Sequence, residues 1–102
     1  MQDCIFCKIV SGEVSANKQY EDAEFLAFDD IAHEAPVHVV VVPKKHVRDL
    51  LDIDYALVGR LQLILPKIAD KLGLRNDYQV YLNSGKYQEV QHLHYHLKGG
   101  EK

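Results

Sequence analysis

The stretch His92-Leu93-His94-Tyr95-His96-Leu97, followed by Gly99 and Gly100, alternates histidines with apolar residues. An alternation of period two that is bounded by glycines predicts a β-strand with one face in a core. The three imidazoles then share the opposite face. Same-face neighbours lie about 6.6 Å apart, so His92 and His96 are separated by roughly 13 Å, too far for all three to bind one metal ion. Three solvated histidines are the alternative interpretation.

Length and charge narrow the class of protein. A chain of 102 residues makes a single domain over residues 1–102 and buries about 65% of its unfolded surface, so a partner subunit would help its stability. The net charge of −3, with acids and bases mixed, gives no basic stripe for nucleic acid. No apolar run is long enough for a membrane span and the first residues do not resemble a signal peptide, so we expect a cytoplasmic protein.

The remaining patterns predict an α+β fold: an antiparallel sheet of about five strands with one long and one short helix, both on one face. We expect a short helix from about Cys4, capped by Asp3, to Ser11 and Gly12. Strands are expected at 18–21 and 24–29 as a hairpin, at 37–42 as a central strand buried on both faces, and at 77–83. The long helix covers 54–72 and is kinked at Pro66, or a second short helix starts there.

Cys4 and Cys7 form a Cys-x-x-Cys pair, for which a metal site, a redox pair, two buried thiols and a disulfide are all possible interpretations. A redox pair of the thioredoxin type would follow a strand, and none precedes these residues. The context therefore favours metal. Two thiolates need two further ligands to close a tetrahedral zinc site.

The motif at 92–97 resembles the histidine triad, His-x-His-x-His followed by an apolar residue. Other segments agree with that family in the expected order and cover nearly the whole chain: 25–31, Ala35-Pro36-Val37-His38, 39–43, Lys44-Lys45-His46, Asn83-Ser84-Gly85 and Gln88-Glu89-Val90. The chain is most similar to the branch of small histidine triad nucleotide-binding proteins. The resemblance implies the HIT-like fold. It also implies a homodimer joined through the long helix and a strand.

For the metal site, the resemblance to zinc-bearing members of the wider family supplies His46 and His92 as the two further ligands of a structural zinc. Such an ion would tie the amino-terminal helix to the sheet.

For catalysis, the resemblance implies that His94 is the nucleophile and forms a nucleotidyl-histidine intermediate. A neutral imidazole suits this step when its other nitrogen is held by a hydrogen bond. His38 interrupts an apolar strand and is expected to hold His94, although a core histidine with a satisfied hydrogen bond is the alternative. His96 is expected to bind a phosphate oxygen and to protonate the leaving group.

For the substrate, the resemblance assigns Asp30 to the ribose hydroxyls. Other contacts are expected from the apolar residues Phe6, Ile9, Phe28 and Ile31 around the base, and from Asn83, Gln88, Glu89 and Val90 near the phosphate. The alternatives are that the four apolar residues belong to the core and that Asp30 caps the turn into Ile31. The chain departs from the family before Gln88, where Tyr87 replaces the usual glycine and the loop is about two residues shorter. Glu89 stands where some relatives place a serine.

The leading hypothesis is therefore a purine-nucleoside phosphoramidate hydrolase. Two alternatives stay open. The first is a dinucleoside polyphosphate hydrolase, and the second is a nucleotide-binding regulator without significant turnover. The nucleotide is the only expected ligand besides zinc, with no organic cofactor.

Overall fold

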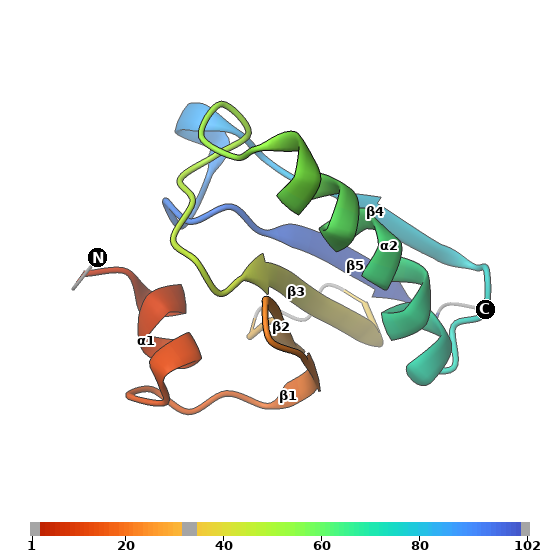
Figure 1. The fold of residues 1–102 in the computed structure, drawn as a ribbon. Coiled ribbons are helices and arrows are strands. Elements are labelled where there is room, and N and C mark those ends of the chain that lie inside the picture. Colours follow the sequence, from red (N-terminus) through yellow and green to blue (C-terminus); the bar gives the residue numbers. More distant parts are fainter. Residues whose placement is uncertain (1–2, 32–34, 101–102) are drawn as a thin grey trace.

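A computed structural model describes residues 3–31 and 35–100, which form one open sheet of five antiparallel strands and two α-helices (Figure 1). The strands lie in the spatial order β1-β2-β3-β5-β4. In chain order the elements are α1 (Ile5–Ser11), β1 (Lys18–Glu21), β2 (Phe25–Asp29), β3 (Val37–Pro43), α2 (Tyr55–Lys71), β4 (Tyr78–Tyr81), the 3₁₀ turn η1 (Gly85–Tyr87) and β5 (Tyr95–Gly99). The predicted fold class is confirmed. The described residues contain no helix with the length and apolarity that a bilayer crossing requires.

The first two strands form the predicted hairpin. Its turn is closed by Asp22, whose Oδ1 accepts hydrogen bonds from the backbone N–H groups of Glu24 and Phe25, both at 2.8 Å. Such Asx turns satisfy backbone donors where the chain reverses. Strand β2 therefore begins at Phe25, one residue later than predicted.

Strand β3 is the central strand that the sequence predicted. It pairs with β2 on one side and with β5 on the other. Its residues alternate between two cores: Val39 and Val41 pack with α2, whereas Val40 and Val42 pack with α1. Burial on both faces explains why this segment is apolar at nearly every position.

The long helix α2 begins after Asp54, whose Oδ1 accepts a hydrogen bond from the N–H of Leu57 at 2.7 Å. It continues through Pro66 to Lys71, so the alternative of a second helix starting at the proline is wrong. Gln62 and Pro66 are both exposed, and water can therefore hydrate the Gln62 carbonyl that loses its helical partner.

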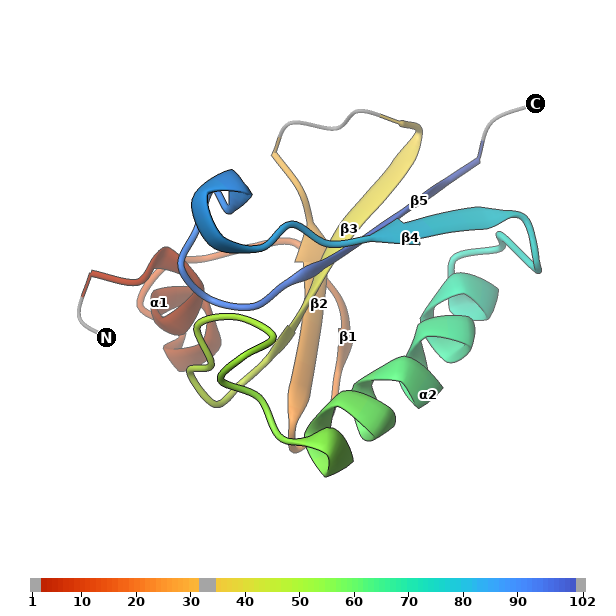
Figure 2. The same cartoon turned by 90° about the horizontal axis from the view of Figure 1, so that it is seen from above.

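The two helices cover opposite faces of the sheet, which corrects the prediction that both lie on one face (Figure 2). The reason is that Phe6 and Ile9 of α1 pack against the side chains of β2 and β3 that point away from α2. The cap of α1 also differs from the prediction. Cys4, not Asp3, is the N-cap, and its Sγ accepts a hydrogen bond from the Cys7 N–H at 3.3 Å.

The histidine segment is only partly a strand. Strand β5 begins at Tyr95, because the N–H of Leu93 donates instead to the carbonyl of Val47 in the loop after β3, at 2.6 Å. Strand β4 is likewise shorter than the predicted 77–83. The alternation itself holds: Leu93, Tyr95 and Leu97 join the core under α2, and the three histidines do not.

Candidate functional site

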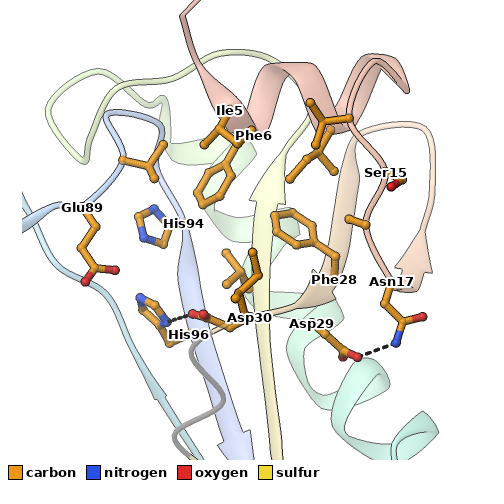
Figure 3. A pocket seen from close by; sticks show the side chains of 16 residues that line it. Ile5, Phe6, Ser15, Asn17, Phe28, Asp29, Asp30, Glu89, His94 and His96 are labelled. Atoms are coloured by element: carbon orange, nitrogen blue, oxygen red, sulfur yellow. Dashed lines mark hydrogen bonds and ion pairs between the residues drawn. The ribbon is translucent and has the colours of Figure 1, made fainter.

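A cavity of about 520 Å³ lies on the face of the sheet that carries α1 (Figure 3). Its apolar part is built around the edge contact between the rings of Phe6 and Phe28, whose centroids are 5.4 Å apart. Its polar part contains two histidines, two aspartates and a glutamate. The residues that the sequence predicted and that line this cavity are Phe6, Ile9, Phe28, Asp30, Ile31, Glu89, Val90, His94 and His96.

All three histidines of the motif are buried, so the interpretation as solvated side chains is wrong. The exposed fractions are 0% for His92, 3% for His94 and 5% for His96. A buried polar ring needs hydrogen-bond partners. These partners differ for each histidine and determine what each can do.

The central histidine, His94, has one nitrogen fixed by the backbone. Its Nδ1 lies 2.8 Å from the carbonyl oxygen of His92. Because a carbonyl can only accept, Nδ1 carries the hydrogen, and in the neutral form of the ring Nε2 carries the lone pair. The ring meets Phe6 edge-on, with the centroids 5.0 Å apart. His94 thus lines the cavity with one ring nitrogen held by the backbone and with its other nitrogen, Nε2, not held by it.

The third histidine, His96, belongs to a buried polar group with His38 and Asp30. Its Nδ1 lies 2.9 Å from Nε2 of His38, and Oδ2 of Asp30 lies 3.4 Å from that His38 nitrogen and 3.6 Å from His96 Nδ1. Burial, first, and then the nearby His94 and His38 lower the pKa of His96 from 6.5 to about 4. His96 is therefore uncharged at neutral pH.

The structure corrects the expected role of His38. We predicted that it holds His94, but it lies against His96, and the carbonyl of His92 holds His94 instead. The register explains this difference, because His94 precedes the paired part of β5 while His96 is the direct partner of Val40 in β3, on the same face as His38. His38 is 2% exposed and its Nε2 has a hydrogen-bond partner, so it also fits the alternative prediction of a buried histidine with a satisfied hydrogen bond.

Two predicted residues lie away from the cavity wall in the part of the chain that the structure describes. Asn83 follows β4 and is half-buried. Gln88 is 7% exposed and donates from Nε2 to the Arg48 carbonyl at 2.8 Å, so it braces the loop after β3. Ile31 does line the cavity, although it is 98% exposed and so lies at the rim.

The sequence did not identify part of the wall. The residues concerned are Ile5, Val14, Ser15, Ala16, Asn17, Asp29 and Val40. Val40 could have been found, because it alternates with His38 on one face of a strand. The segment 14–17 has no periodicity, and only the packing of α1 brings it to the cavity.

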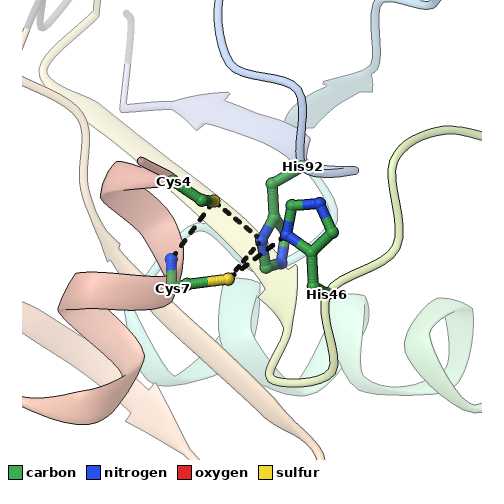
Figure 4. Close-up of side chains that lie close together, drawn as sticks. All are labelled: Cys4, Cys7, His46 and His92. Carbon is green, nitrogen blue, oxygen red and sulfur yellow. Dashed lines mark hydrogen bonds between the residues drawn. The ribbon is translucent and has the colours of Figure 1, made fainter. Parts of the chain in front are cut away.

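A second cluster joins the two cysteines to two histidines (Figure 4). Sγ of Cys4 lies 3.3 Å from Nδ1 of His92, and Sγ of Cys7 lies 3.2 Å from Nδ1 of His46 and 3.6 Å from that of His92. The residues come from α1, from the loop after β3 and from the motif. The resemblance therefore named a set of four that the fold does bring together. Both thiols are free, so the disulfide interpretation is wrong.

The distances in this cluster suit a tetrahedral zinc ion. Sulfur at about 2.3 Å and nitrogen at about 2.0 Å from one ion lie roughly 3.5 Å apart. Nε2 of His92 lies 2.8 Å from the carbonyl of Pro43, so it carries the hydrogen and Nδ1 offers its lone pair to the thiols. Burial and the adjacent Cys4 thiol raise the pKa of Cys7 to about 11, so two thiolates here require a cation.

Comparisons with known proteins agree with this fold and site. The model of the HIT domain family matches residues 11–102. Protein HitA of Neisseria gonorrhoeae is 40% identical over 104 aligned residues, which cover 97% of each chain. A histidine triad protein from Clostridium difficile has a TM-score of 0.93 at 44% identity, covering 100% of this chain and 94% of that one. A HIT family hydrolase from Legionella pneumophila has a TM-score of 0.92 at 37% identity, with 98% and 95% covered.

The fold, the cavity with His94 and His96, and the cysteine cluster with His92 therefore define a histidine triad protein. The chain belongs to the HIT family, and its fold is that of the HIT family hydrolase to which it is similar.

Proposed function

We propose that the protein hydrolyses purine-nucleoside phosphoramidates, or related derivatives of nucleoside monophosphates, through a nucleotidyl-histidine intermediate on His94. The observation that carries this proposal is the hydrogen bond from His94 Nδ1 to the His92 carbonyl. It leaves a lone pair on Nε2 in a buried site that lines a cavity with both apolar and polar walls. A held, neutral imidazole of this kind is an activated nucleophile.

In the first step Nε2 of His94 attacks the phosphorus atom, the bond from phosphorus to the leaving nitrogen breaks, and that nitrogen takes a proton from His96, which the water of the second step returns. His96 is uncharged, and when His38 Nε2–H donates to His96 Nδ1, the other nitrogen of His96 carries the hydrogen that first contacts a phosphate oxygen and then passes to the amine. Water then attacks phosphorus and releases His94. Over the two steps one water molecule is consumed. Its hydroxyl group is added to phosphorus, and its remaining proton is added to the amine.

The cavity would hold the nucleoside between its apolar wall and Asp30. The base would lie near Phe6, Phe28 and Ile9, and the carboxylate would accept the ribose hydroxyls. Glu89 and Val90 would flank the phosphate side of His94, as their place in the cavity wall suggests. Asn83 and Gln88 would act only indirectly, by supporting the shortened loop.

The second cluster would hold one structural zinc ion through Cys4, Cys7, His46 and His92. The ion would join α1 to the loop after β3 and to the start of the histidine segment. It would take no part in the chemical steps. Its effect on the reaction would be to hold His92, whose carbonyl fixes His94.

The experiment compares the parent protein with His94→Ala on an adenosine phosphoramidate and on a diadenosine polyphosphate. We expect the parent to cleave the phosphoramidate faster, and His94→Ala to lose turnover by roughly 10³-fold or more while it still binds adenosine monophosphate. Rapid quench of the parent in an alkaline denaturant should trap adenylate on the protein, because the phosphorus–nitrogen bond to His94 survives alkali but is hydrolysed in acid.

Asp29→Ala is the control, because Asp29 also lines the cavity but belongs to neither the histidine group nor the cysteine cluster, so this variant should keep its turnover. Turnover by His94→Ala near the parent rate would contradict the proposal. Faster cleavage of the polyphosphate would favour the other hydrolase, and nucleotide binding without turnover of either substrate would favour the binding protein.

A further inference from the structure

Tyr81, at the end of the edge strand β4, lies flat on the imidazole of His96. The two ring centroids are 4.7 Å apart and the ring planes differ by 14°. Tyr81 and His96 are direct cross-strand partners in the pairing of β4 with β5, so the backbone itself sets this contact. Paired aromatic side chains on neighbouring strands are a recognised source of sheet stability.

The ammonium of Lys98 also lies over the Tyr81 ring, 4.9 Å from its centroid. Lys98 follows His96 by two residues and shares its face of β5. A cation over an aromatic ring is attracted by the negative face of that ring. Tyr81 is thus held by two residues of β5, and one of them is the histidine of the cavity.

The other groups that face His96 meet its ring through Nδ1 or at an angle, including the His38 ring, whose plane differs by 46°. His38 and Asp30 both approach Nδ1, and His94 meets the ring at an angle of 69° with a centroid distance of 5.0 Å. One hydrogen bond can be kept over a range of ring tilts, since the final torsion of a histidine side chain is broad. Among the residues that the structure describes, Tyr81 alone lies nearly parallel to the ring.

We propose that Tyr81 is a positioning residue for His96. By covering one face of the imidazole it fixes the ring plane, so that Nδ1 meets His38 while the other nitrogen stays directed into the cavity. This inference rests on the proposed function for its kinetic consequence but not for its geometry. Because the contact uses the ring alone, phenylalanine should replace tyrosine, whereas an aliphatic side chain of similar size should not.

The test compares Tyr81→Leu with Tyr81→Phe, and uses Tyr78→Leu as the matched control. Tyr78 lies on the same strand but packs with the core under α2. In Tyr81→Leu we expect kcat for the adenosine phosphoramidate to fall roughly 10-fold with little change in KM, because the hydrogen bond from His96 matters most in the transition state. Tyr81→Phe should keep the parent kcat, and Tyr78→Leu should keep the ratio of kcat to KM.

A second readout needs no substrate. The ring protons of His96 should be shifted upfield by the Tyr81 ring in the NMR spectrum of the parent and of Tyr81→Phe. They should move downfield in Tyr81→Leu and stay in place in Tyr78→Leu. Nuclear Overhauser contacts between the two rings of the parent test the stack even if Tyr81→Leu does not fold.

Absence of those contacts in the parent would overturn the proposal, and so would equal losses of kcat in Tyr81→Leu and Tyr81→Phe. An unchanged His96 signal in folded Tyr81→Leu would do the same. If the spectra change as expected but the parent cleaves no phosphoramidate, the positioning of His96 stands and the proposed function fails.

Discussion

His92 and His94 lie two residues apart, on the same side of one segment, and both are buried, yet they point their lone pairs at different partners. His92 donates from Nε2 to the Pro43 carbonyl, which leaves Nδ1 facing the two thiols. His94 donates from Nδ1 to the His92 carbonyl, which leaves Nε2 free of the backbone. Each ring is thus held by one hydrogen bond to a carbonyl, through Nε2 in His92 and through Nδ1 in His94. The nitrogen that stays available therefore faces the cysteine cluster in His92 and differs in His94, which lines the cavity.

Residue type and spacing therefore do not distinguish a metal ligand from a nucleophile. Both uses need a neutral imidazole with a fixed tautomer. What differs is the group in front of the lone pair: sulfur atoms that can share a cation for His92, and an open cavity with an aspartate for His94.

The largest effect on stability should come from breaking the cysteine cluster. We expect the purified protein to contain about one zinc ion per chain, and Cys4→Ser and His46→Ala to lose it. Because such an ion would link α1 to the sheet, the melting temperature should fall by on the order of 10 °C. Elemental analysis and calorimetry measure both quantities.

His94→Ala is the matched control for these variants, since it removes a buried histidine from the other site. It should keep the zinc. Freshly prepared protein that was never exposed to a chelator and that lacks zinc would remove the metal proposal.

The next effect concerns Asp30, the acid of the cavity. A carboxylate that accepts ribose hydroxyls contributes about 1.5–3 kcal/mol, so Asp30→Ala should weaken adenosine monophosphate binding roughly 10- to 100-fold. The parent should prefer the ribonucleotide to its 2′-deoxy counterpart, and the variant should lose that preference. Titration calorimetry with both nucleotides measures it.

Asp29→Ala is the control, because Asp29 also lines the cavity but its oxygens already accept hydrogen bonds from Asn17 and Gln19. It should keep the ribose preference. A parent without this preference would mean that Asp30 serves only His38 and His96, which lie within 3.6 Å of its carboxylate.

A smaller effect is expected from acid. The folded protein holds the pKa of His96 near 4, below the ordinary 6.5, so between these values the unfolded chain binds a proton that the folded chain does not. The free energy of unfolding should therefore be highest above about pH 6.5. It should fall as the pH drops toward 4, by on the order of 1 kcal/mol or more.

Urea unfolding from pH 4 to 7.5 measures this dependence in the parent and in His96→Gln. Any acid effect of the cysteine cluster is common to both proteins, so their difference isolates His96. A parent and a variant with the same pH profile would show that His96 is not the group responsible.

A substitution on the exposed surface of α2 should have the smallest effect on the cavity and on the cysteine cluster, although it should change the oligomeric state. Leu63 is 71% exposed there, and the predicted homodimer uses this helix and a strand. Leu63→Glu should convert a dimer into a monomer in light scattering at the same protein concentration, because a charge at an apolar interface is costly. Zinc content should stay unchanged.

Leu51→Glu is the control, since Leu51 is 93% exposed in the loop before α2. It should stay dimeric. A parent that is monomeric at high concentration would contradict the predicted assembly.

Local patterns were sufficient for most of the fold. The apolar run of β3, the helical spacing of α2 and the alternation of residues 92–97 each result from one physical period, and each was predicted from the sequence. The errors arose where distant segments meet. The extent of β5 depended on a bond from Leu93 to Val47, and the side of the sheet that α1 covers depended on where Phe6 and Ile9 could be buried.

The amino-acid sequence by itself determined most of the elements and the buried central strand, because these follow from side-chain type and spacing along the chain. Its resemblance to the histidine triad family supplied the candidate site residues. Only the tertiary structure decided which nitrogen of each histidine is held, that His38 faces His96, that Tyr81 covers His96, and that residues 14–17 line the cavity. The physical reason is that hydrogen bonds and ring contacts depend on distances of a few ångströms between segments far apart in the sequence, and no local pattern specifies these distances.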